Sequence, residues 1–201
     1  MKGIPFPVCI KALTGFTVLV FDPSSDQNRI LLDYLVKAAQ LSGKMAFKEG
    51  IFTARPNEAG NHIEPFVLDA LGQVGLKTGK PISKSGKKKV AGYPDIQIED
   101  KFGRTVYLDC KTYNTLTKGQ SFRTFYFSPS KDPKITKDAF HLLMSFEITT
   151  AERKGKRAFI PVSWQVYTLE KLLIQIKHEF NASNRELYMR EALLAEGKIT
   201  E

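Results

Sequence analysis

Apolar residues recur every three or four positions in two stretches of the first third of the chain. This spacing places them on one face of a helix, and it predicts helices from about Asp26 to Ser42 and from Asn61 to about Val74. Gly43 and Gly75 follow these stretches, where a glycine commonly ends a helix. Residues 43–60 are expected to form a loop with a short extended piece, and the residues before the first helix an irregular arm or strand.

The pattern changes after residue 90, where short β-branched and aromatic runs are separated by polar turns. Tyr93–Ile98 and Thr105–Thr112 flank the polar sequence EDKFGR, and they are predicted to form a β-hairpin. Further strands are expected over residues 122–127 and 158–167. Helices are expected over residues 136–150, from Thr168 onward and from Ser183 onward.

This order of elements favours the α/β (α+β) class, with a central mixed β-sheet flanked by helices. The 201 residues, of which 42% are hydrophobic and 25% charged, suit one domain with a packed core. Residues 1–60 would supply an N-terminal arm, helix and loop. Residues 61–150 would form the core, and residues 151–201 a C-terminal strand and helices.

Composition argues against several classes of protein. No apolar run reaches the roughly 18 residues of a membrane-spanning helix, because Lys11 interrupts the best candidate, Cys9–Phe21. Pro5 and Pro7 do not suit a signal peptide. The two cysteines form no spaced metal motif, so we expect a soluble protein of the reducing cytoplasm that has no membrane partner.

Positive charge is concentrated in one interval. The formal net charge is +9, and no acidic residue stands between Asp69 and Asp95. That interval holds six lysines: Lys77, Lys80, Lys84, Lys87, Lys88 and Lys89. A basic segment of this kind favours a polyanionic partner such as nucleic acid, although a solvated surface loop has the same composition.

Two aspartates stand among β-forming residues, where a carboxylate is unusual. Because side chains alternate along a strand, Asp109 and Lys111 share one face. If Ile98 pairs with Val106 across the hairpin, Asp95 lies opposite Asp109 on that same face. Two opposed carboxylates repel each other unless a divalent cation lies between them. A slip of one residue would turn Asp95 away, so the arrangement depends on the register.

The sequence PD at Pro94–Asp95 and the sequence DCK at Asp109–Lys111 resemble the motif of the PD-(D/E)xK nuclease superfamily. That superfamily includes most type II restriction endonucleases, several repair nucleases and Holliday-junction resolvases. The resemblance covers residues 61–126, and DCKTY followed by SFRTFYFSPS is similar to restriction enzymes in particular. It implies a restriction-endonuclease-like fold and hydrolysis of double-stranded DNA at specific sequences.

The resemblance also implies roles for individual residues. Asp95, Asp109 and the main-chain carbonyl of Cys110 would bind Mg²⁺, for which Mn²⁺ could substitute. Lys111 would lie near the attacking water and the scissile phosphate. Glu64 would be a further catalytic and metal-binding acid, although its position three residues after Asn61 also fits a helix-capping box. The expected products are 5′-phosphate and 3′-hydroxyl ends.

The implied biological setting is a prokaryotic cytoplasm, with a homodimer as the active form and a cognate DNA methyltransferase in the same system. The residues expected to contact DNA are Lys84, Lys87, Lys88, Lys89, Tyr113, Asn114, Lys118, Arg123, Lys131 and Lys134. Three alternatives stay open from the residues alone. These are a structure-specific repair nuclease or junction resolvase, a non-catalytic DNA-binding protein, and a surface ion pair between Asp109 and Lys111.

Overall fold

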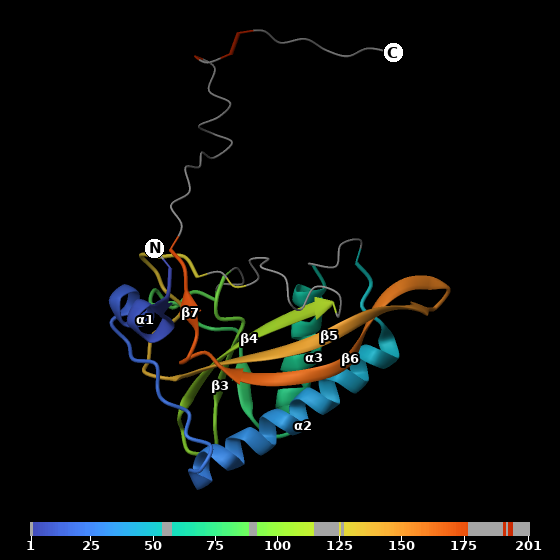
Figure 1. Ribbon diagram of the computed structural model, residues 1–201, viewed down its shortest axis with the longest axis horizontal. Coiled ribbons are helices and arrows are strands. Elements are labelled where there is room, and N and C mark those ends of the chain that lie inside the picture. Colours follow the sequence, from blue (N-terminus) through green and yellow to red (C-terminus); the bar gives the residue numbers. More distant parts are fainter. Residues whose placement is uncertain are drawn as a thin grey trace.

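The computed structural model describes residues 2–53, 58–88, 92–114, 125, 127–176, 191 and 193–194. Along the chain its elements are β1 (Ile4–Pro5), α1 (Phe6–Thr14), α2 (Asp26–Glu49), α3 (Ala59–Gln73), β2 (Lys77–Gly79), β3 (Ile96–Glu99), β4 (Thr105–Asn114), β5 (Phe140–Arg153), β6 (Lys156–Thr168) and β7 (Leu173–Ile174). Figure 1 shows the long strands β4, β5 and β6 crossing the molecule, with α2 along one side of them.

The central sheet has five strands in the order β2-β3-β4-β5-β6. β4 and β5 run parallel, whereas the other neighbouring pairs are antiparallel. The sheet is therefore mixed, which confirms the predicted fold class. β1 and β7 form a separate two-stranded pair that joins the start of the chain to the segment after β6.

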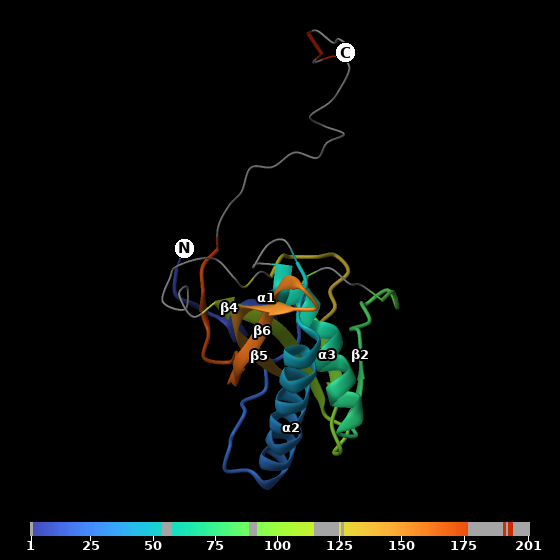
Figure 2. The same cartoon turned by 90° about the vertical axis from the view of Figure 1, so that its right-hand side faces the viewer.

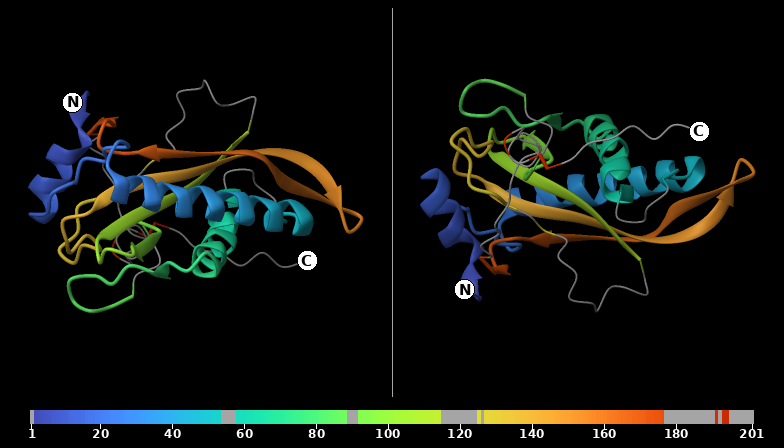
Figure 3. Two further views of the ribbon diagram at one scale, coloured as in Figure 1. Left: turned by 90° about the horizontal axis from the view of Figure 1, so that it is seen from below. Right: turned by 90° about the horizontal axis from the view of Figure 1, so that it is seen from above.

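Helices cover the two faces of the sheet unequally. α2 and α3 pack against each other, α2 lies along β6 and α3 lies against β4 (Figure 2). Val106 and Leu108 of β4 point into this helical side, and they join a core with Leu35 of α2 and Val67 of α3. Seen from below, α2 follows the long β5–β6 hairpin for most of its length (Figure 3).

Within the described residues, the opposite face is covered at one end only. Tyr107 of β4 points to this side and packs with Phe6 and Ile10 of α1, and with Ala139 just before β5. Beyond this second cluster, alternation along β4 places Asp109, Lys111 and Tyr113 on the same face. α1 therefore seals one end of the face that carries the predicted site and leaves the other end to polar residues.

Three predictions for the first half of the chain were wrong. Residues 6–14 form α1 where an irregular arm was expected. α2 continues through Gly43 to Glu49, because buried Ser42 and Ala46 extend its inward face by more than a turn. α3 begins at Ala59, two residues before the predicted start, and Glu64 therefore does not occupy a capping-box position.

The largest error concerns residues 136–150, which were predicted to be helical but contain most of β5. β5 lies between β4 and β6, and its residues 140–142 and 144–146 are all buried. Its apolar residues Phe140, Leu142, Met144 and Phe146 alternate along one face, but Leu143 on the other face also gives a helical spacing with Phe140, and periodicity alone does not separate the two elements in so short a segment. Residues 169–176 are likewise not helical, since they form a turn and β7.

The strand at residues 158–167 and the turn at ERKGKR are confirmed. β6 pairs with β5 through a two-residue turn in which Lys154 (φ 54°) and Gly155 (φ 68°) are left-handed, as tight hairpins require. The strand predicted at 122–127 lies largely outside the described residues, and the helix predicted from Ser183 lies almost wholly outside them. In the described part of the chain, no helix is both long and apolar enough to cross a membrane.

Candidate active site

The β3–β4 hairpin has the predicted register. Ile98 lies opposite Val106 and Ile96 lies opposite Leu108. Asp95 directly precedes β3, and its N–H donates a hydrogen bond of 3.2 Å to the carbonyl of Leu108. The pairing thus continues to the position where Asp95 faces Asp109.

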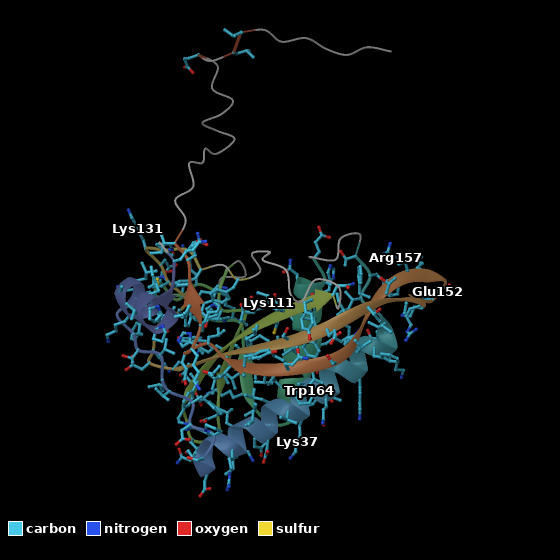
Figure 4. All side chains as sticks on the ribbon, in the orientation of Figure 1. Lys37, Lys111, Lys131, Glu152, Arg157 and Trp164 are labelled. Atoms are coloured by element: carbon cyan, nitrogen blue, oxygen red, sulfur yellow. The ribbon has the colours of Figure 1, made fainter. Side chains whose placement is uncertain are left out.

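The side chains of this pair meet around one ammonium group. Lys111 Nζ lies 2.7 Å from Asp109 Oδ2 and 3.9 Å from Asp95 Oδ2. It also donates a hydrogen bond of 3.2 Å to the carbonyl oxygen of Cys110. Asp95 Oδ2 in turn accepts a 2.8 Å hydrogen bond from the Cys110 N–H, which fixes the direction of that carboxylate. Lys111 lies on the side of the sheet away from α2, whereas Trp164 lies on the α2 side (Figure 4).

Burial makes Asp109 the most perturbed acid of the site. The residue is only 2% exposed, and burial together with the negative charge of Asp95 raises its pKa to about 7, against the lowering effect of Lys111. Burial lowers the pKa of Lys111, but the charges of Asp109 and Asp95 outweigh it, so that the net change is upward. Lys111 is therefore a permanent cation. Asp109 Oδ2 is paired with it at 2.7 Å.

Glu64 approaches the site from α3 but is held by a different cation. Its carboxylate forms an ion pair with Lys80, which follows β2, and both side chains are largely buried. Burial is the main cause of the raised pKa of Cys110, and the charges of Asp95, Asp109 and Glu64 add to it. Among the described residues no cluster of three His, Cys, Asp or Glu side chains is arranged to hold a metal ion. Any cation here would depend on two carboxylates and main-chain oxygen.

Lys134, which was expected to contact a phosphate, lies against the turn before Asp95. The residue is 5% exposed, and its Nζ donates hydrogen bonds to the carbonyl oxygens of Gly92 and, at 2.9 Å, Pro94. It lies beneath the turn that leads to Asp95 and is not accessible to DNA. Sequence reasoning also missed Tyr93, whose hydroxyl lies 2.6 Å from His141 Nδ1 in the core.

Tyr113 belongs to a polar network on the same face as Lys111. Its hydroxyl has one proton, for which two acceptors are in reach, Gln165 Oε1 at 3.0 Å and Glu147 Oε2 at 3.3 Å. Ser163 donates to the same Glu147 oxygen at 2.8 Å. Tyr113 and its partners continue the polar surface from Lys111 across β5 and β6. Asn114 ends β4 and is half-buried, and alternation turns it to the opposite, helical face of the sheet.

The remaining predicted DNA contacts are either exposed or outside the described residues, and Lys77 of the same basic interval was not among them. Lys84, Lys87, Lys88 and Lys131 are exposed. Asp132 accepts hydrogen bonds from Ser83 and Ser85, and so it joins the loop that carries the first three to the loop that carries Lys131. Lys77 is paired with Glu99. Lys89, Lys118 and Arg123 lie outside the described residues.

Comparison with known proteins agrees with this geometry. A family model described as the type II restriction enzyme MjaV family matches residues 1–191. The curated type II restriction enzyme MjaV of Methanocaldococcus jannaschii is 39% identical over 211 residues, which cover 98% of this chain and 90% of that protein. No solved structure matched the chain. The resemblance to type II restriction endonucleases is thereby confirmed, and the chain belongs to the MjaV family of type II restriction enzymes.

Proposed function

We propose that the protein is a Mg²⁺-dependent endonuclease that cuts double-stranded DNA at a specific sequence and leaves 5′-phosphate and 3′-hydroxyl ends. The observation that carries the proposal is the cluster of Asp95, Asp109 and Lys111 at one end of the β3–β4 hairpin. Family membership supports the same activity.

The donor set fits a hard divalent cation. Asp95 and Asp109 offer carboxylate oxygens, Cys110 offers its main-chain carbonyl, and Mg²⁺ prefers oxygen ligands with one or two carboxylates. Asp109 is buried beside Asp95 and, among the described residues, carries only one cationic neighbour at close range, Lys111, so a divalent cation would relieve the repulsion between the two carboxylates. When bound, the cation would neutralise the carboxylate pair and lower the pKa of an attached water. Glu64 would be a further acid next to these cation ligands.

Lys111 would serve as an electrostatic support. Its pKa is raised by the two carboxylates, so it holds its proton near neutral pH and is poorly suited to accept one from water. An ammonium beside the scissile phosphate would orient the attacking water and offset the negative charge that develops on the phosphorus oxygens. The Cys110 N–H would keep Asp95 aimed at the same point.

The exposed lysines would bind the DNA backbone. Contacts with phosphates do not distinguish one base sequence from another, but they fix the orientation of a protein on the duplex. The residues proposed for this role are Lys84, Lys87, Lys88 and Lys131. A homodimer with two-fold symmetry would place one active site on each strand of a palindromic sequence. A cognate methyltransferase would protect the host's own sites.

Digestion of a long natural DNA tests this proposal. The wild-type protein with Mg²⁺ should give discrete fragments whose sequenced ends share one site, and chelation should stop the reaction. Asp109→Ala should abolish cutting, whereas Asp33→Ala, an exposed acid on α2, should not. A smear would favour a structure-specific nuclease, and cutting by Asp109→Ala would contradict the assigned site.

A further inference from the structure

A buried ammonium group donates hydrogen bonds to the turn that precedes Asp95. Lys134 lies before β5, about forty positions away in sequence, and its ammonium donates to the carbonyl oxygens of Gly92 and Pro94. Pro94 is the residue directly before Asp95. A buried ammonium is costly unless its donors are used, so a lysine at this place indicates a requirement for those two contacts.

The same turn has a second anchor. Tyr93 is buried, its ring packs edge-on against Phe6 at 5.8 Å, and its hydroxyl lies 2.6 Å from His141 Nδ1 on β5. Burial lowers the pKa of His141 to about 3, so its imidazole is neutral, and one hydrogen bond joins its Nδ1 to the tyrosine hydroxyl. The three consecutive residues of the turn are therefore all held: Gly92 and Pro94 by Lys134, which lies before β5, and Tyr93 by His141 of β5.

Asp95 itself is fixed by β4. Its N–H bonds to the Leu108 carbonyl and its carboxylate accepts from the Cys110 N–H. The backbone before Asp95 is thus set by Lys134 and Tyr93, and the residue itself by the neighbouring strand. Small displacements of such a group are costly for catalysis, since a misplacement of about 1 Å can reduce a rate about 100-fold.

We infer that Lys134 is a positioning residue, which holds the Gly92–Pro94 turn so that Asp95 meets Asp109 in the geometry that binds the divalent cation. This role rests on the proposed function, and it replaces the phosphate contact predicted from the sequence. Lys134 touches neither DNA nor the reacting atoms. It acts through the backbone of the turn.

Removing the cation from position 134 should weaken metal binding without altering DNA binding. In Lys134→Met, Mn²⁺ affinity of the free protein, measured by titration calorimetry, should fall about 10-fold or more, as it does when outer partners of metal ligands are lost. DNA affinity in chelator and its dependence on salt should stay as in the wild type. Lys134→Gln keeps an amide donor, and should recover part of the Mn²⁺ affinity if the hydrogen bonds matter.

Lys131→Met is the matched control, because Lys131 lies three residues earlier and is exposed (Figure 4). It should leave Mn²⁺ affinity unchanged and lower the salt slope of DNA binding by about 0.9. A reduced salt slope in Lys134→Met would show a phosphate contact and overturn the inference. Unchanged Mn²⁺ affinity in a folded Lys134→Met would also overturn it.

Two further results keep the inference separate from the proposed function. If Lys134→Met does not fold, Tyr93→Phe removes only the hydroxyl of the second anchor, and it should weaken Mn²⁺ binding in the same direction. Unchanged Mn²⁺ affinity in that variant would count against the inference. Failure of the wild-type protein to cut DNA with Mg²⁺ would instead reject the proposed function itself.

Discussion

Asp109→Asn should make the metal-free protein more stable at neutral and alkaline pH while it abolishes cleavage. The pKa of Asp109 is raised from 3.8 to about 7 chiefly by burial, so the folded protein binds this proton more tightly than the unfolded chain does. Stability from this group is fully present below pH 4 and is lost as the pH rises towards 7. Asparagine has nearly the same shape and no charge to bury, so the stability of the variant should not fall over this pH range.

The size of the effect follows from the difference between the two pKa values. That difference is about three pH units, and at about 1.36 kcal/mol per unit it amounts to about 4 kcal/mol over the whole range. Between pH 5 and pH 7 the free energy of unfolding of the wild type should therefore fall by about 2–3 kcal/mol relative to Asp109→Asn. Asp109 is 2% exposed, so solvent screening does not reduce this figure much.

Urea unfolding in chelator, followed by circular dichroism at pH 5, 6, 7 and 8, measures the effect. The difference between wild type and Asp109→Asn should widen up to about pH 7 and then level off. Asp33→Asn, which changes an exposed acid on α2, should run parallel to the wild type. Equal pH dependence in wild type and Asp109→Asn would refute the reasoning. Saturating Mg²⁺ should restore the wild type and leave Asp109→Asn unaffected.

Three other substitutions test separate parts of the molecule. Lys111→Met should slow single-turnover cleavage by about 100- to 1000-fold, as loss of one preorganised donor does, while DNA binding measured with Ca²⁺ persists; near-normal cleavage would remove Lys111 from the site. Replacing Lys84, Lys87 and Lys88 together by glutamine should lower the salt slope of DNA binding by about 2–3, because each phosphate contact contributes about 0.9; an unchanged slope would place DNA elsewhere. Phe146→Ala, at a fully buried position of β5, should cost about 3–5 kcal/mol of stability in urea unfolding; a cost below about 1 kcal/mol would show that the core around β5 is loosely packed.

The hairpin was predictable because its signals are local. EDKFGR marks a turn, and alternation on either side assigns the faces of the strands. Once Ile98 is paired with Val106, the meeting of Asp95 and Asp109 follows from the register alone. The short spacing of Asp109 and Lys111 on one strand requires no tertiary information either.

β5 could not be assigned in this way because its environment comes from distant parts of the chain. It is buried between β4 and β6, with α2 on one face and the α1 cluster at one end of the other. Apolar residues do alternate along one face, at Phe140, Leu142, Met144 and Phe146, but Leu143 on the other face also completes a helical spacing. Phe140, Leu143 and Met144 then match a helical stripe by coincidence.

Lys134 shows the same limit at the level of one side chain. A lysine in SPSKDPKIT suggests an exposed loop, and Lys131 of that sequence is indeed exposed. Lys134 is buried because Gly92 and Pro94 pack against it, and a local sequence pattern does not predict a contact between residues about forty positions apart. The same reasoning applies to Glu64, whose partner Lys80 follows the first strand of the sheet.

β4 passes from fully buried to half-exposed between Cys110 and Lys111, and this step is a boundary in dielectric constant. On the buried side a charge is weakly screened, whereas Lys111 is partly exposed, and near a protein surface the attraction of two charges 4 Å apart is about 4 kcal/mol. DNA that packs closely on this face would displace the water, and Lys111 would then lie in a region of low dielectric constant. The lysine would then attract a phosphate several times more strongly, so tight docking at the correct sequence would itself strengthen catalysis. The ratio of single-turnover rates at cognate and near-cognate sites should consequently exceed the ratio of their binding affinities.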